Sequence, residues 1–142
     1  MGHHDEARMD ARFTDFAKQM NLYLNHFPKH EKFGLAQTIR CKAYELYGFV
    51  IEAQKRYQKK TSLTNADIAH EQLRMLIRLA YELGYFAFKD GTKIDNGLER
   101  TATHRYLAIS RMVDELGRLI GGWIVADKNK SIPVAGTKRE VS

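Results

Sequence analysis

The apolar residues of this chain recur at helical spacing in four successive segments. The first segment covers about residues 5–24, and the second covers about residues 34–58. Steps of three and four residues place a run of side chains on one helix face, which is the pattern of an amphipathic helix. The positions expected to face a core are Met9, Phe13, Phe16, Met20 and Tyr23, and then Ile39, Ala43, Leu46, Val50, Ala53 and Tyr57.

The same periodicity continues in the second half of the chain. The third segment covers about residues 64–88, with Thr64 as its expected N-cap, and the fourth covers about residues 98–126. Their expected core positions are Ala69, Leu73, Leu76, Leu79, Leu83 and Phe86, and then Ala102, Tyr106, Ile109, Val113, Leu116, Ile120 and Trp123.

Polar, turn-forming stretches separate the four segments. The stretch NHFPKHEKFG contains Pro28, which lacks a backbone donor, and the stretches KKTSLTNAD and KDGTKIDNG are rich in turn formers. No segment competes with the helices by the strict alternation that is typical of a strand. The pattern predicts an all-α fold, an up-down-up-down four-helix bundle over residues 1–126. Residues 127–142 are polar and are expected to form a flexible tail.

The charge of the chain indicates an anionic partner, with nucleic acid as the first expectation. The formal net charge is +6 over 142 residues. The single cysteine, Cys41, excludes an internal disulfide, suits a reducing compartment, and is expected to be a small buried packing residue. No apolar run is long enough to cross a membrane, and the N-terminal stretch does not have the pattern of a secretory signal. We therefore expect a cytoplasmic protein without membrane association.

Bundle chemistry of the di-iron type is not supported by the sequence. That chemistry needs Glu-x-x-His pairs on two helices, and no glutamate here is followed by a histidine three residues later. No two of the histidines inside the bundle share a tight ligand spacing, so each is expected to be solvated or to cap a helix: His26, His30, His70 and His104. We expect no metal, no cofactor and no catalytic residue.

One catalytic alternative remains open. Some helical-bundle ribonucleases of the HEPN class carry an arginine and a histidine separated by four to six residues. In this chain Arg100 and His104 have three residues between them, and they share one helix face. Loss of metal-independent RNA cleavage in a His104→Ala variant would favour this alternative.

The basic residues suggest a binding surface. Arg74 and Arg78 lie one turn apart among apolar residues in LRMLIRLA, and Arg111 and Arg118 share a face of the fourth helix. An arginine among apolar neighbours needs a carboxylate, a phosphate or an interface. Pairing with Glu45, Glu82 or Asp114 is the structural alternative to a ligand role. A further cluster, which includes Lys55 and Arg56, closes the second helix, where cations also favour the helix dipole.

The stretch DELGRLIGGWI places three glycines inside an apolar helix. Each interior glycine costs a helix roughly 1 kcal/mol relative to alanine. Gly117 and Gly121 share one face and are expected to allow a close approach of another helix. Gly122 is expected to relieve crowding beside Trp123, which needs burial. We take these four residues as packing or assembly residues.

Three stretches resemble the accessory variability determinant proteins of diversity-generating retroelements: FPKHEKFGLAQTI, LRMLIRLA and above all DELGRLIGGWI. The similarity covers about residues 23–124, and the arginines four apart in the third helix also match. The four-helix-bundle proteins encoded in ribosomal RNA intervening sequences form a related group and are the alternative within this class. The GRLIGGW ending fits the retroelement group better.

The resemblance implies a basic homopentameric ring of four-helix bundles. It further implies a non-catalytic protein that binds the reverse transcriptase together with RNA and DNA. In this family the accessory protein supports the mutagenic copying of a template RNA into cDNA. The aromatic residues of the chain are also more numerous than one narrow seam accommodates, so some are expected at a subunit interface: Tyr44, Tyr47, Phe49, Tyr81, Tyr85 and Phe86.

Overall fold

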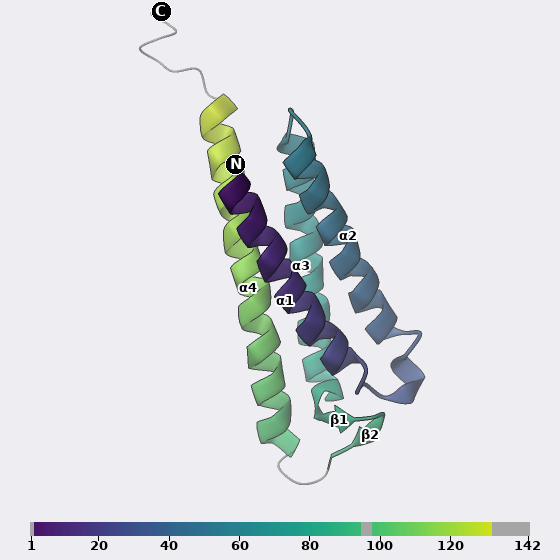
Figure 1. Cartoon of the computed structure of the whole chain (residues 1–142). Coiled ribbons are helices and arrows are strands. Elements are labelled where there is room, and N and C mark those ends of the chain that lie inside the picture. The colour runs from purple at the N-terminus through teal and green to yellow at the C-terminus, as the bar shows by residue number, and fades with distance from the viewer. Residues whose placement is uncertain (1, 95–97, 132–142) are drawn as a thin grey trace, which may run out of the picture.

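The structure, a computed structural model, describes residues 2–94 and 98–131. Within these residues, four long helices lie side by side and alternate in direction (Figure 1). They are α1 (His3–Leu24), α2 (Leu35–Lys55), α3 (Lys60–Glu82) and α4 (Leu98–Ser131). Both α1 and α3 pack against α2 and α4. The prediction of an all-α, up-down-up-down four-helix bundle is confirmed.

The two ends of the bundle are built differently. At one end, only residues 56–59 connect α2 to α3. The other end, which we call the loop end, contains residues 25–34 and the described residues 83–94 of the connection to α4. The loop end is the lower end in Figure 1. It holds two short 3-10 turns and a small hairpin: Lys29–Glu31, Tyr85–Ala87, β1 (Phe88–Lys89) and β2 (Thr92–Lys93).

The hairpin corrects the expectation that residues 89–97 are simply a loop. Strands β1 and β2 are antiparallel, with Phe88 opposite Lys93. The turn between them is Asp90–Gly91, and both residues have positive φ, 51° and 81°. Asp-Gly is the type of pair that adopts a tight two-residue hairpin turn at little cost, because both residues tolerate the left-handed region.

Most of the expected core positions are buried, but three are not. Tyr57 is 80% exposed because α2 ends at Lys55 and the chain continues in an extended conformation. Leu79 and Leu83 are also exposed, whereas Ile77 and Ala80 are buried. The expected series took two successive steps of three residues, to Leu76 and then to Leu79. Together these steps place Leu79 about 120° around the helix from the inward face.

The remaining expected positions are buried or partly buried against the same core. Cys41 is another correction, because it is exposed. It lies on the outer face of α2, between the buried positions Ile39 and Ala43. No helix in the described part of the chain is apolar enough over a sufficient length to cross a membrane.

Helix α3 begins and ends earlier than the periodicity predicts. It starts at Lys60, so Thr64 lies inside the helix and does not cap it. It ends at Glu82, because Gly84 adopts a left-handed φ of 81° and its N–H donates to the carbonyl of Tyr81. A left-handed glycine just after the last turn is a common way for a helix to end.

The other helix ends differ by a few residues. Helix α1 begins at His3, and α2 ends at Lys55 where residue 58 was expected. Helix α4 continues to Ser131, so residues 127–131 are helical and do not belong to a flexible tail. The rest of the expected tail, residues 132–142, lies outside the described residues.

Candidate nucleic-acid interface

Arg74 and Arg78 lie on α3, and each has an acidic partner within one turn of the same helix. The Arg74 guanidinium donates from Nε and Nη2 to the two carboxylate oxygens of Glu71, at 3.1 and 2.7 Å. The Nε atom of Arg78 lies 4.0 Å from Oε2 of Glu82. Pairing with Glu82 was among the alternatives that the sequence left open. The sequence reasoning had not considered the pairing of Arg74 with Glu71.

The pKa values follow from this geometry. The hydrogen bond from Arg74 lowers the pKa of the Glu71 carboxyl, and it raises the pKa of the Arg74 guanidinium. The negative charge of Asp114, on α4, adds a smaller contribution to the rise at Arg74. Arg74 therefore lies on the side of α3 that faces α4. A carboxylate already accepts hydrogen bonds from two of its guanidinium nitrogens.

On α4, Arg118 pairs with Glu115 through its Nη2 atom. This hydrogen bond is the main reason that the pKa of Glu115 is lowered, and the charges of Arg12 and Arg8 on α1 contribute further. Arg111 is exposed and makes no ion pair among the described residues. Three of the four arginines in the expected binding surface, which we call the α3–α4 face, thus have a carboxylate beside them, so this face carries alternating charge and not a continuous positive potential.

Lys55 and Arg56 lie at the end of α2, opposite the loop end. The Arg56 Nη2 atom is 3.9 Å from Oε2 of Glu52, and Lys55 is exposed. The ammonium of Lys59 donates to the carbonyls of Ala53 and Arg56, which satisfies backbone acceptors at the helix end. Lys59 thus stabilises the end of α2, and the binding role of Lys55 and Arg56 stays a prediction.

Gly117 allows a close approach between α3 and α4, through a side chain. His70 of α3 is only 9% exposed, and its Nε2 atom lies 2.8 Å from the Val113 carbonyl oxygen of α4. A Cβ atom at Gly117 would lie 2.6 Å from Cε1 of this imidazole. Gly117 thus makes room for a side chain of α3, whereas the sequence predicted the close approach of another helix. The expectation that His70 is solvated or caps a helix is wrong.

The other residues of the glycine motif behave differently. A Cβ atom at Gly121 or Gly122 would meet nothing within 4 Å outside the neighbouring helix backbone and chain neighbours. Gly121 is therefore not needed for packing inside this chain, in contrast to Gly117. Trp123 is buried, as expected, with 4% of its surface exposed.

The remaining histidines do not come together as ligands. His26 Nδ1 accepts a hydrogen bond from the backbone N–H of Asp90, and the His30 ring contacts the edge of Tyr85. His104 and Arg100 are both exposed on α4. Within the described residues, no three His, Cys, Asp or Glu side chains form a group that could hold a metal ion.

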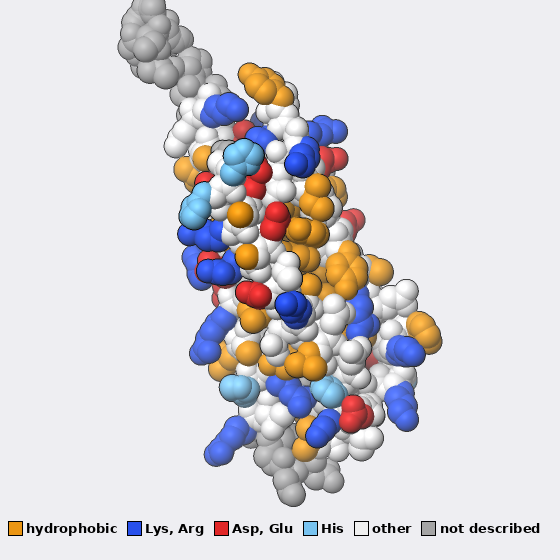
Figure 2. All heavy atoms as spheres, in the orientation of Figure 1, with side chains coloured by type: hydrophobic (Ala, Val, Ile, Leu, Met, Phe, Trp, Pro, Cys, Tyr) orange, Lys and Arg blue, Asp and Glu red, His pale blue; other side chains and the backbone are white. Residues whose placement is uncertain are grey.

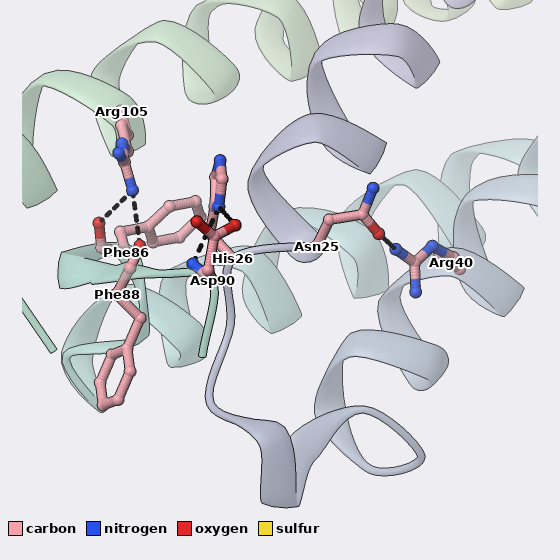
Figure 3. Close-up of polar contacts among 7 residues, drawn as sticks. All are labelled: Asn25, His26, Arg40, Phe86, Phe88, Asp90 and Arg105. Atoms are coloured by element: carbon pink, nitrogen blue, oxygen red, sulfur yellow. Dashed lines mark hydrogen bonds and ion pairs between the residues drawn. The ribbon is translucent and has the colours of Figure 1, made fainter. Parts of the chain in front are cut away.

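The loop end contains arginines that the sequence reasoning missed. Arg105 donates from Nη1 to the carbonyls of Phe86 and Phe88, at 3.3 and 2.8 Å (Figure 3). Arg40 donates from Nη2 to the side-chain oxygen of Asn25, at 2.8 Å, and from Nε to that of Asn21, at 2.7 Å. Asn21, in the last turn of α1, and Asn25, just after its end, are four residues apart and were the available signal for the site around Arg40.

The surface view places these residues in context. In Figure 2, basic side chains gather around the loop end, and acidic side chains lie among the basic ones higher up along α4. Apolar side chains gather between α1 and α2 in the middle of the same face. The loop end is therefore a second candidate for contact with an anion, beside the α3–α4 face that the sequence favoured.

Comparison with known proteins gives one match. A family model described as bAvd-like matches residues 9–126, from the first turns of α1 to near the end of α4. Because the match covers well over half of the chain, the chain belongs to the bAvd-like family. The resemblance to accessory variability determinant proteins is thereby confirmed. Searches of curated proteins and of solved structures gave no match.

Proposed function

We propose that this member of the bAvd-like family is a non-catalytic accessory protein of a diversity-generating retroelement. In this role it binds the reverse transcriptase and the template RNA or its cDNA, and it supports the mutagenic cDNA synthesis of retrohoming. The observation that carries the proposal is the family match over residues 9–126, which covers α2 and α3 in full and most of α1 and α4. The protein is proposed to need no cofactor.

Nucleic-acid binding is proposed to depend mainly on phosphate contacts. The net charge of +6 favours an anionic partner. The described residues form a helical bundle with a small hairpin, and within them we find no module that reads base edges. Binding should therefore have little sequence preference and should weaken steeply as salt rises, because each neutralised phosphate releases counterions.

We further propose that the chain assembles into the homopentameric ring that the family resemblance implies. A row of exposed apolar residues on α3 supports self-association, because they lie one or two turns apart on one face: Ile68, Met75, Leu79 and Leu83. The aromatic residues give less support than expected. Phe86 is buried, and Tyr47, Phe49, Tyr81 and Tyr85 pack against the core of their own chain. Tyr44 remains half exposed.

Co-purification with the reverse transcriptase of its own retroelement is the direct test of the function. Charge reversal in an Arg74→Glu/Arg78→Glu variant should abolish association with the reverse transcriptase or with RNA while the protein stays helical by circular dichroism. The matched control is Arg8→Glu/Arg12→Glu, which reverses two exposed arginines one turn apart on α1. If both partners bind the α3 variant as well as they bind the wild type, Arg74 and Arg78 are not the interface. If the wild type binds neither partner, the proposed function is wrong.

Light scattering tests the assembly. The wild type should have the mass of five chains, and a Met75→Glu/Leu79→Glu variant should have a lower mass. A Leu22→Glu variant serves as the control, because Leu22 is equally exposed but lies on α1. A wild-type mass equal to one chain at micromolar concentration would refute the ring.

A further inference from the structure

A cavity of about 330 Å³ opens at the loop end. Its floor is apolar and includes Leu24 and Phe27, and its remaining walls come from the connection between α1 and α2, from the start of α2 and from the hairpin turn. Three cations line it: Lys29, Lys32 and Arg40. Asp90 is the only carboxylate among its lining residues. The cavity thus has a positive balance, unlike the α3–α4 face.

Arg40 is held in place without being neutralised. Its guanidinium donates to the side-chain amide oxygens of Asn21 and Asn25, which are polar but uncharged. Asn21 is itself fixed, because its amide nitrogen donates to the Ala17 carbonyl and to the Tyr44 hydroxyl. Its oxygen therefore faces Arg40. Among the described residues Arg40 forms no ion pair, and its guanidinium has five N–H groups, of which these bonds use two.

The two lysines, like Arg40, have no opposite charge beside them among the described residues. The Lys29 stem lies across Gly91, where a Cβ atom would come within 2.7 Å of Lys29 Cγ. The hairpin glycine therefore makes room for this side chain as well as for the turn. The Lys32 ammonium lies over the ring of Phe33, 5.4 Å from its centroid. Neither lysine has a carboxylate partner among the described residues.

Asp90 provides the opposing charge. Its Oδ1 atom lies 3.3 Å from Nδ1 of His26, and its own backbone N–H donates to the same nitrogen. One carboxylate against three cations leaves the cavity suited to an anion with more than one charged oxygen. A phosphate group meets this requirement, and an arginine fork fits its geometry.

We propose that this loop-end cavity binds a phosphate group of an RNA or DNA strand, with Arg40 as the oriented donor and Lys29 and Lys32 beside it. The proposal rests on the nucleic-acid binding proposed above, and it assigns that binding to residues outside the α3–α4 face. The apolar floor gives the rest of the nucleotide a surface to lie on, whereas the cations at the walls hold its charge.

Binding of a single-stranded RNA, followed by fluorescence anisotropy at two salt concentrations, tests the cavity. A Lys29→Gln/Arg40→Gln variant should bind about tenfold more weakly at low salt, with a salt dependence reduced by one to two units. The matched control is Lys18→Gln/Lys60→Gln, which removes two exposed lysines outside the cavity lining. Its binding should weaken less than about threefold, as expected from loss of general attraction alone. Equal losses in the two variants would overturn the proposal.

A second variant tests the cavity by a gain in binding, which misfolding cannot imitate. Asp90→Asn removes the opposing carboxylate and keeps a residue that tolerates positive φ. It should tighten RNA binding more than Asp15→Asn, which removes an exposed carboxylate on α1. No difference between these two variants would count against the cavity.

Inorganic phosphate separates failure of the cavity from failure of the proposed function. The side-chain Nε–H signal of Arg40, identified by its loss in Arg40→Lys, should shift saturably with phosphate but not with chloride at equal ionic strength. If the wild type binds RNA but this signal does not respond, the cavity assignment is wrong and the proposed function stands. If the signal responds but no RNA or DNA is bound, the strand assignment and the proposed function both fail.

Discussion

On the α3–α4 face, three arginines have a carboxylate within one turn of their own helix. At the loop end, Arg40 and Arg105 are instead held by neutral oxygens from distant parts of the chain. The local pairs are exposed, such as Arg74 with Glu71, and such pairs contribute little to stability because water and salt screen them. A neutral acceptor fixes the direction of a guanidinium and leaves its charge available.

The number of arginines on a face is therefore a poor measure of its attraction for phosphate. The α3–α4 face has more arginines in regular spacing, yet the acids between them reduce its potential. The loop end has fewer, but its cavity combines three cations with one carboxylate. The comparison predicts that substitutions on the two regions differ in stability, in pH dependence and in nucleic-acid binding.

The largest expected effect is at Gly117 of α4, against which the buried His70 side chain of α3 packs. Gly117→Ala would force a Cβ atom to within 2.8 Å of His70 Nε2, which is fixed on the Val113 carbonyl. We expect a loss of about 1–3 kcal/mol from overpacking, larger than the gain in helix propensity of about 1 kcal/mol. Urea unfolding at fixed protein concentration measures it.

Gly121→Ala is the matched control, because a Cβ atom there has open space within the chain. It should gain up to about 1 kcal/mol from helix propensity alone. In a His70→Ala background, the cost of Gly117→Ala should disappear, since the clashing ring is gone. If Gly117→Ala and Gly121→Ala change the free energy of unfolding equally, the imidazole does not set the need for glycine.

The next effect compares one arginine from each region. Arg105→Met should cost about 1–2 kcal/mol, because it leaves the partly buried carbonyls of Phe86 and Phe88 without this donor. Arg74→Met should change the free energy of unfolding by less than about 0.5 kcal/mol, because its pair with Glu71 is exposed. Thermal unfolding of both variants gives the comparison, and equal shifts in Tm would remove the distinction between the two regions.

The sequence predicts the middle of the bundle better than its loop end, and the reason is the range of the contacts. Helical periodicity depends on neighbours three and four residues apart, so the seam positions of α1, α2 and α4 were largely correct. The sequence reasoning had also left Glu82 open as one of three acidic partners for Arg74 and Arg78, and in the structure it lies beside Arg78. Helical periodicity failed for Leu79 and Leu83. These leucines are exposed on the outer side of α3, although their spacing is like that of core residues.

The loop-end contacts join residues that periodicity cannot connect. Arg40 meets Asn21 and Asn25 across the first connection, and Tyr85 reaches Glu31 from the other connection. Such pairs depend on how the two connections fold over one another. The sequence indicated the turn at Asp90–Gly91, but it indicated neither the end of α3 before Gly84 nor the site that these turns help to build. His70 was missed for the same reason, since its partner is a backbone carbonyl of another helix.

A smaller effect should appear in acid at the loop end. The Tyr85 hydroxyl donates to Glu31 Oε2 at 2.6 Å, and this bond is the main cause of a Glu31 pKa below the ordinary value of 4.5. The Leu35 N–H contributes second. A carboxyl whose pKa is lowered by folding stabilises the protein above its unfolded pKa, and this stabilisation is lost as pH falls through the folded pKa.

Tyr85→Phe keeps the ring but removes that bond. We expect it to be less stable than the wild type by on the order of 1 kcal/mol near neutral pH, after allowance for screening. The difference should shrink below about pH 4.5 as Glu31 takes up a proton. Urea unfolding of both proteins at about pH 6.5 and about pH 3 measures it. A difference that stays constant with pH would mean that the Tyr85 hydroxyl acts on stability without acting through the Glu31 carboxylate.

The smallest expected effect asks whether the acids on α3 are what separates the two regions. Glu71→Gln removes the carboxylate that accepts the hydrogen bonds of the Arg74 guanidinium. RNA binding should then tighten by about two- to threefold at low salt, and the gain should vanish at high salt because it is electrostatic. Asp15→Asn gives the same change in net charge from an exposed position on α1 that has no ion pair among the described residues. If Glu71→Gln tightens binding more than Asp15→Asn does, Arg74 contacts a phosphate, and Glu71 weakens that contact in the wild type. If the two variants gain equally, Arg74 only adds to the general charge, and the loop end remains the better candidate for a specific contact.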